Sequence, residues 1–206
     1  MLLALMVLFI SLLPINSNAQ DISNTPAFTS SSDDIYNNPL TPAFGNSDAD
    51  VTIIEYYDYL CPYCKDEEEG LEKLLNEDSN IKIIYKDIPK HGPLSITAAI
   101  ASLASLRQGE DKYLAFHNAL MSKDTSLTSE DMLYQIAGSV GLDVSKLKQD
   151  MSDATFSNQV QDNITVAKSI GVRITPTFII GGYFFPGDSG YDKLKQMVDY
   201  VRSNKK

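Results

Sequence analysis

The spacing of hydrophobic residues changes along the chain from strand-like to helical and back. β-branched and aromatic residues dominate 51–57 and 81–88, which predicts two buried strands. From Pro62 to about Glu77, between these strands, leucines recur at helical spacing on one face. The order strand, helix, strand predicts two parallel strands joined by a right-handed crossover.

The following part of the chain lacks strand patterns, and a second strand region comes after it. Helical spacing predicts helices at 94–107, 111–121, 129–140, 144–151 and roughly 155–170. The runs 175–180 and 183–187 flank the pair Gly181-Gly182, which predicts a β-hairpin, and 191–203 predicts a closing helix. The predicted order is therefore β-α-β, a helical block, and β-β-α.

The first residues have the pattern of an export signal. Residues 2–13 form a run in which every residue except Ser11 is apolar; the run is too short to span a bilayer comfortably, and Pro14 ends it. Ser-Asn-Ala at 17–19 has the form of a cleavage site, so we predict that residues 1–19 are a signal peptide. No basic residue precedes Lys65, which leaves two alternatives: the true start lies upstream, or this segment is retained as a membrane anchor. Residues 20–49 are rich in Ser, Asn, Asp, Thr and Pro, and we expect them to form a flexible lead-in.

Composition excludes several classes of protein. The formal net charge of −10 argues against nucleic acid or an anionic membrane surface as a main partner. Hydrophobic residues make up 43% of the chain, enough to bury a core, and two cysteines are too few for a disulfide-dense scaffold. The chain is therefore expected to fold without structural disulfide bonds, and the two cysteines need another explanation.

Cys61 and Cys64 lie two residues apart in the sequence CPYC. A structural zinc site needs four ligands, and His91 and His117 are too far apart in sequence to supply the second pair, so we expect neither a metal nor a cofactor. A disulfide that closes so short a loop stabilises little, because it removes little entropy from the unfolded chain. With a zinc site and a stabilising disulfide both disfavoured, redox chemistry is the remaining interpretation of the cysteine pair.

The position of the pair supports redox chemistry. Cys61 follows a predicted strand and opens a predicted helix, where unpaired amides and the helix dipole lower the pKa of a thiol. Pro62 suits the first helical turn, and Cys64 lies one turn deeper. We therefore expect Cys61 to exchange with substrate and Cys64 to resolve the mixed disulfide.

Glu55 interrupts the apolar strand at 51–57, six residues before Cys61. A buried carboxylate is costly and raises its pKa, so Glu55 is a candidate proton donor and acceptor for Cys64. The alternative is a carboxylate at the strand edge that reaches solvent. Lys86 on the neighbouring strand is a candidate partner for Glu55, although a surface lysine is the favoured interpretation.

The dipeptide Thr175-Pro176 stands at the start of a predicted strand. A proline lacks a ladder donor there, and either a cis peptide bond or a place on an edge strand would accommodate it. In a loop beside Cys61, the backbone of Thr175 could pair with an extended substrate peptide.

Three segments together resemble the exported DsbA-like thiol:disulfide oxidoreductases of the thioredoxin superfamily: AFGNSDADVTIIEYYDYLCPYC, YKDIPKHGP and TPTFIIGG. The resemblance implies an α/β thioredoxin fold, here 50–92 and 171–206, interrupted by an inserted helical domain at 93–170. It implies that Cys61 and Cys64 form the redox-active disulfide, that Pro176 is cis, and that Glu55 occupies the family's carboxylate position. It also implies a bacterial periplasm or cell envelope location.

The resemblance also implies partners. Oxidases of this family pass a disulfide to reduced or unfolded exported proteins, and a quinone-linked membrane protein reoxidises them. An isomerase or reductase of the same fold is the alternative, but isomerases usually carry a dimerisation domain, for which 20–49 is too short, so we expect a monomer. A third alternative is an envelope binding protein with a vestigial CxxC.

Two features depart from the best-known strong oxidants. The dipeptide Pro62-Tyr63 replaces Pro-His, so Tyr63 offers a hydroxyl where those enzymes have a histidine. The acidic run 66–69 places carboxylates near the thiolate, whose charge they would repel. We therefore expect a weaker oxidant.

His91 is interpreted as a loop histidine, with a place at the rim of the active site as the alternative, and His117 as a helix residue satisfied by packing or solvent.

Overall fold

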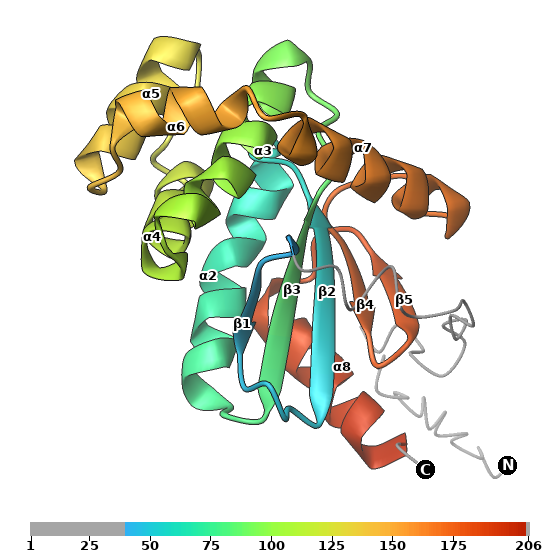
Figure 1. Cartoon of the computed structure of the whole chain (residues 1–206). Helices are drawn as coiled ribbons and strands as arrows, with labels where there is room; N and C mark the ends of the chain where they lie inside the picture. Colours follow the sequence, from blue (N-terminus) through green and yellow to red (C-terminus); the bar gives the residue numbers. More distant parts are fainter. Residues whose placement is uncertain (1–39, 205–206) are drawn as a thin grey trace, which may run out of the picture.

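The computed structural model describes residues 40–204, and the predicted signal peptide and most of the predicted lead-in lie outside this range. A five-stranded sheet forms the centre of the molecule, in the order β1-β3-β2-β4-β5 (Figure 1). Its strands are β1 (Ala43–Gly45), β2 (Val51–Tyr57), β3 (Ile81–Asp87), β4 (Thr177–Ile180) and β5 (Tyr183–Pro186). The pair β2 and β3 is parallel, as predicted, and the other neighbours are antiparallel.

Helices cover both faces of the sheet. Alternate residues of β2 point to opposite sides, so Ile53 and Tyr57 join the larger core and Ile54 and Tyr56 join the smaller one. The helices α2 (Pro62–Glu77) and α8 (Gly190–Asn204) pack on the larger core, whereas α7 (Ala154–Ser169) covers the smaller core (Figure 1).

The helical block inserted between β3 and β4 begins with α3 (Pro93–Ser105) and a 3₁₀ turn (Leu106–Gln108). It continues with α4 (Glu110–Met121), α5 (Glu130–Ser139), α6 (Val144–Met151) and α7, and stands over one end of the sheet (Figure 1). The chain therefore has the predicted thioredoxin fold with a helical insertion.

The hydroxyl of Tyr59 ties the loop after β2 to this insertion. It hydrogen-bonds the side chain of Ser102 on α3 and lies 2.9 Å from Nδ1 of His117 on α4. Tyr57 donates to the same hydroxyl at 3.0 Å. His117 is a helix residue, as predicted, and it is fully buried among tyrosine rings rather than in contact with solvent, with Nε2 3.4 Å from the Glu68 carboxylate.

Two features differ from the sequence predictions. The expected flexible lead-in 20–49 contains strand β1, because Ala43, Phe44 and Gly45 pair with β3. The interpretation of Lys86 as a surface lysine is wrong: the residue is 3% exposed, and its Nζ donates to Oγ1 of Thr41 at 2.8 Å.

Strand β4 begins at Thr177, two residues later than predicted, since Pro176 has no N–H for the ladder. Within residues 40–204, no helix has the length and apolar character needed to cross a membrane.

Candidate active site

Cys61 lies where β2 ends and α2 begins, at the end of the sheet beneath the inserted helices (Figure 1). It is the N-cap residue of α2: its backbone is extended, and its carbonyl accepts from the amide of Lys65 at 3.3 Å. Pro62 follows in the first turn, where no amide donor is needed. The predicted helix opening at the first cysteine is confirmed.

The two thiols are free and have opposite acidities. A hydrogen bond from the Cys64 thiol lowers the pKa of Cys61 to about 6, against the effect of burial, and Thr175, the Cys64 amide and the charge of His91 contribute. Burial raises the pKa of Cys64, which is fully inaccessible. Cys61 is therefore the thiolate near neutral pH, and Cys64 stays protonated.

The peptide bond between Thr175 and Pro176 is cis, as the family resemblance implied. This turn lies against the first cysteine, with Sγ of Cys61 3.4 Å from the carbonyl oxygen of Thr175. Thr175 precedes β4 and takes no part in the ladders that the described strands form with β4. The structure thus brings Cys61, Cys64, Thr175 and Pro176 together.

Cys61 contributes to the wall of a groove of about 640 Å³. The residue itself is only 2% exposed, so an incoming thiolate reaches its sulfur from within the groove. Two side chains of the wall, Tyr63 and Ile174, are 60% and 50% exposed. The remaining lining residues are Pro62, Lys90, His91, Arg173, Thr175, Gly187 and Asp188.

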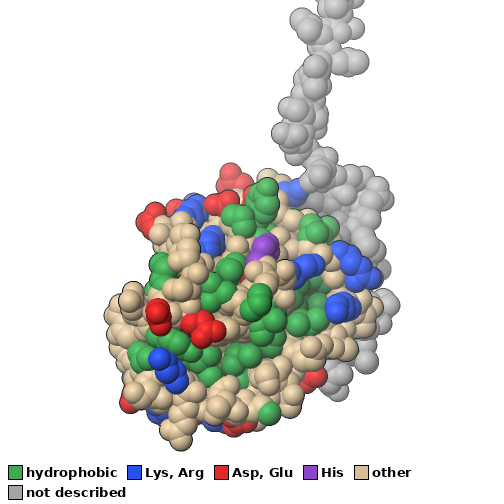
Figure 2. All heavy atoms as spheres, turned by 90° about the horizontal axis from the view of Figure 1, so that it is seen from above, with side chains coloured by type: hydrophobic (Ala, Val, Ile, Leu, Met, Phe, Trp, Pro, Cys, Tyr) green, Lys and Arg blue, Asp and Glu red, His purple; other side chains and the backbone are tan. Residues whose placement is uncertain are grey.

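His91 stands on the rim of this groove, so the alternative interpretation was correct and the favoured one was incomplete. Its Nδ1 lies 2.7 Å from Oδ2 of Asp58. Figure 2 shows hydrophobic side chains and lysine or arginine side chains around the exposed histidine, which is His91 because His117 is buried. Its positive charge contributes to the low pKa of Cys61.

Asp58 is a site residue that the sequence reasoning missed. It is 2% exposed and accepts from the amides of Leu60 and Lys90 at 2.8 and 2.6 Å, and from the Ser95 hydroxyl at 2.6 Å. Burial raises its pKa, but these hydrogen bonds and that of His91 prevail and hold the pKa below its usual value. Asp58 is therefore an anion that fixes the loops on both sides of Cys61. One feature of the sequence could have identified Asp58 as a site residue: it stands directly after the strand and three residues before the first cysteine.

Glu55 is fully buried on the sheet face that carries the larger core, which excludes the alternative of a solvent-exposed strand edge. Neither carboxylate oxygen has a hydrogen-bond partner among the described residues. Burial raises its pKa well above the usual value, and the charges of Glu68, Glu67 and Cys61 add to this effect. Lys86 pairs in register with Tyr56, so it points to the opposite face and is not the partner of Glu55.

The acidic run 66–69 was expected to place its carboxylates near the Cys61 thiolate, but two of them are directed to other elements. The first turn of α2 contains no acidic residue, and Glu67 and Glu68 are buried against other elements. Glu67 accepts from the amides of Ser189 and Gly190 at the start of α8. The structure thus removes much of the expected repulsion, and the pKa of Cys61 is low despite this run.

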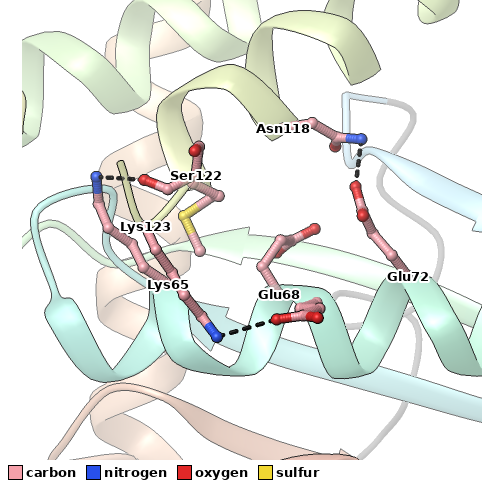
Figure 3. Close-up of a pocket in the computed structure, with 8 residues that line it drawn as sticks. Lys65, Glu68, Glu72, Asn118, Ser122 and Lys123 are labelled. Atoms are coloured by element: carbon pink, nitrogen blue, oxygen red, sulfur yellow. Dashed lines mark hydrogen bonds and ion pairs between the residues drawn. The ribbon is translucent and has the colours of Figure 1, made fainter. Parts of the chain in front are cut away.

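A second pocket of about 260 Å³ lies between α2 and α4. Figure 3 shows Glu68 and Glu72 of α2 on one side and Asn118 of α4 on the other, with Asn118 donating to Glu72 at 2.6 Å. Lys65 points to this side and donates to the carbonyl of Ser122 at 3.5 Å. Within residues 40–204, no cluster of His, Cys, Asp and Glu could hold a metal ion.

Comparison with known proteins identifies the family to which this chain belongs. The model of the family described as Thioredoxin matches residues 37–200. The chain is 26% identical over 167 residues to disulfide bond formation protein D of Bacillus subtilis (strain 168), which covers 77% of this chain and 75% of that protein. It also matches 24% of the length of a Na⁺/H⁺ antiporter NhaA of Salinispora tropica, so it corresponds to a part of that protein only.

Two solved structures are similar over most of their length. A thioredoxin-like oxidoreductase from Silicibacter pomeroyi DSS-3 is 34% identical with a TM-score of 0.79, covering 84% of this chain and 99% of the other. A periplasmic thioredoxin-like protein from Salmonella enterica serovar Typhimurium is 27% identical with a TM-score of 0.75, covering 84% and 95%. This chain belongs to the thioredoxin family and is a DsbA-like thiol:disulfide oxidoreductase, with Cys61 and Cys64 as its CxxC pair.

Proposed function

We propose that this protein is an oxidase that introduces disulfide bonds into exported proteins through Cys61 and Cys64. The observation that carries the proposal is the opposite acidity of the two thiols, with the pKa of Cys61 lowered to about 6 and that of Cys64 raised by burial. A stabilised Cys61 thiolate favours the reduced form of the enzyme, and a disulfide whose reduced form is stabilised is a better oxidant.

The reaction proceeds through two exchanges. A substrate thiolate attacks Sγ of Cys61 and breaks the Cys61–Cys64 bond, which gives a mixed disulfide and a Cys64 thiolate that takes up a proton. A second substrate thiolate then attacks the substrate sulfur and displaces the Cys61 thiolate. The substrate loses two electrons and gains a disulfide, and the enzyme leaves as the dithiol.

Glu55 supplies the proton for Cys64 in this scheme. Its carboxyl is buried on the face that carries both cysteines, and its raised pKa keeps a proton available near neutral pH. The charge of Glu55 in turn raises the pKa of Cys64, so the two groups affect each other's protonation.

Thr175 and Pro176 form the backbone against which substrate aligns. The carbonyl of Thr175 faces Cys61, and the residue lies outside the described ladders of β4, so an extended peptide can pair with it beside the sulfur. Tyr63 of the active-site dipeptide contributes exposed aromatic surface to the same groove.

The oxidising strength of the enzyme lies between the family extremes. The attacking cysteine has a pKa of about 7 in thioredoxin and about 3.5 in DsbA, and a lower value accompanies a stronger oxidant. The pKa of about 6 for Cys61 supports an oxidising strength closer to that of thioredoxin, in line with the absence of a histidine in the dipeptide.

The cellular setting follows from the sequence. Residues 1–19 direct export to the periplasm or cell envelope, where the chain is released or stays anchored by this segment. The partners are reduced exported proteins and a quinone-linked membrane protein that reoxidises the Cys61–Cys64 pair. We expect a monomer.

The test is oxidation of a reduced, unfolded model protein by the oxidised enzyme, followed by alkylation of the remaining thiols. The wild-type protein should convert substrate thiols to disulfides, whereas Cys61→Ala and Cys64→Ala should both be inactive, because neither variant can form the Cys61–Cys64 disulfide that supplies the oxidising equivalents. Reshuffling of scrambled disulfides without net oxidation would favour an isomerase. A midpoint potential below about −300 mV would indicate a structural disulfide and a binding protein.

A further inference from the structure

The groove beside Cys61 carries a charge opposite to that of the whole chain. The formal net charge of the protein is −10, yet the groove wall contains Lys90, His91 and Arg173. Among the described residues that line it, Asp188 is the only acid. A basic site on an acidic protein contrasts with its surroundings and attracts a carboxylate specifically.

Arg173 differs from the other arginines of the chain in its contacts. Arg107 forms ion pairs with Asp150 and Asp153, and Arg202 forms them with Asp50 and Asp78. Arg173 instead donates to carbonyl oxygens, that of Lys168 at 3.0 Å and that of Val172 at 3.3 Å. Among the described residues it forms no ion pair, so it is held in place with its charge unneutralised.

The other two basic groups are also held at the rim. Nζ of Lys90 donates to the carbonyl of Arg173, and no described carboxylate pairs with it. His91 is fixed by the buried Asp58. Carbonyl contacts orient a cation without cancelling its charge, so Lys90 and Arg173 remain able to bind an anion in the groove.

Apolar surface completes the groove. Tyr63, Ile96 and Ile174 are the large hydrophobic side chains most exposed among the described residues, and two of them line this groove. A volume of about 640 Å³ accommodates a few side chains of an extended peptide. In Figure 2, hydrophobic side chains and lysine or arginine side chains lie around the exposed histidine.

We propose that this groove selects reduced protein segments in which an acidic residue stands close to the reacting cysteine, beside an apolar residue. The occupant is an extended segment of an exported protein, whose carboxylate meets Arg173 and Lys90 while its cysteine reaches Cys61. The proposal rests on the proposed function, because it names the substrates of the same site.

The test uses short single-cysteine peptides with one variable position, occupied by Asp, Asn or Lys, placed either before or after the cysteine. The second-order rate of mixed-disulfide formation with the oxidised protein is measured by mass spectrometry. The same peptides are reacted with a small aromatic disulfide, so that each rate is corrected for the intrinsic reactivity of its thiol. Variants are Arg173→Gln and Lys90→Glu, with Lys195→Glu on α8 as the control outside the groove.

In at least one of the two series, the corrected rate should be about threefold to tenfold higher for the Asp peptide than for the Lys peptide, the range expected for exposed ion pairs. The preference should fade at high salt. Arg173→Gln should weaken it, Lys90→Glu should abolish or reverse it, and Lys195→Glu should leave it unchanged.

Equal corrected rates for all peptides, in a protein that reacts with each of them, would overturn the inference and leave the proposed function intact. Binding of anionic vesicles without discrimination between peptides would also overturn it, since the basic rim would then belong to a membrane contact. Failure of every peptide to form a mixed disulfide would sink the proposed function, and the inference with it.

Discussion

The imidazole of His91 lies with Nδ1 2.7 Å from Oδ2 of Asp58, which joins the loop after β3 to the loop that leads into Cys61. Asp58 is buried and His91 faces the groove, so the carboxylate positions the ring from behind. The positive charge absent from the active-site dipeptide is supplied here from another loop, and its contribution to Cys61 can be measured.

Replacement of His91 by Ala should raise the pKa of Cys61, because the charge of His91 is one of the contributions that lower it. It is the smallest of these contributions, so we expect a rise of less than about one pKa unit and a midpoint potential lower by less than about 30 mV. Absorbance of the thiolate against pH and equilibration with glutathione measure the two quantities. Lys195→Gln is the control, and an unchanged pKa in folded His91→Ala would contradict the assignment.

The two cysteines should differ sharply in reactivity in the reduced protein. Alkylation of Cys61 by iodoacetamide should increase with pH around a midpoint of about 6, whereas Cys64 should stay unmodified across this range. Removal of the Cys64 thiol in Cys64→Ala should move the midpoint of Cys61 upwards, since that hydrogen bond is the largest contribution to the low pKa. Equal modification of both cysteines would contradict the structural asymmetry.

Replacement of Glu55 by Gln should slow catalysis and stabilise the fold. The loss of a proton donor and acceptor for Cys64 should reduce the turnover rate by about 10²-fold. The folded-state pKa of Glu55 is raised, so the wild-type protein loses stability as pH rises above the unfolded value of about 4.3, and the variant escapes this loss. We expect Glu55→Gln to be more stable at pH 8 by about 1–3 kcal/mol in urea unfolding. A variant less stable than wild type at pH 8 would refute this account.

The thermal stability of the whole protein should be higher at pH 5.5 than at pH 8. Burial raises the pKa of Glu67 and of Asp87 to about 7, and that of Glu55 is raised as well. Each of these groups contributes stability that is complete below its unfolded pKa of about 4 and is lost as pH rises through its folded value. Glu67→Gln should flatten part of this slope in a series of melting curves. A melting temperature that rises steadily from pH 5.5 to 8 would show that other groups dominate.

The sequence predicted most of the fold because its hydrophobic spacing is regular. The strands β2 and β3 and the helices α2 to α8 were located within about two residues of their ends. Strand β1 was missed, since its three residues have no pattern of their own and become a strand only by pairing with β3.

The candidate site was predictable where chemistry depends on local order along the chain. The positions of Cys61 and Cys64 follow from a strand that runs into a helix. The roles of Asp58 and His91 depend on contacts between residues 33 positions apart, which no local pattern shows. The same holds for Glu67 and Glu68: their spacing on the helix does not reveal that α8 and α4 bury them.

Tyr59 stands two positions before the reactive Cys61. Its hydroxyl contacts Ser102 on α3 and His117 on α4. Displacement of the inserted helices would therefore pull on the loop that leads into Cys61. Substitutions in the interior of the insertion should therefore change the midpoint potential of the Cys61–Cys64 pair. The insertion would then adjust the chemistry of the site as well as stand over one end of the sheet.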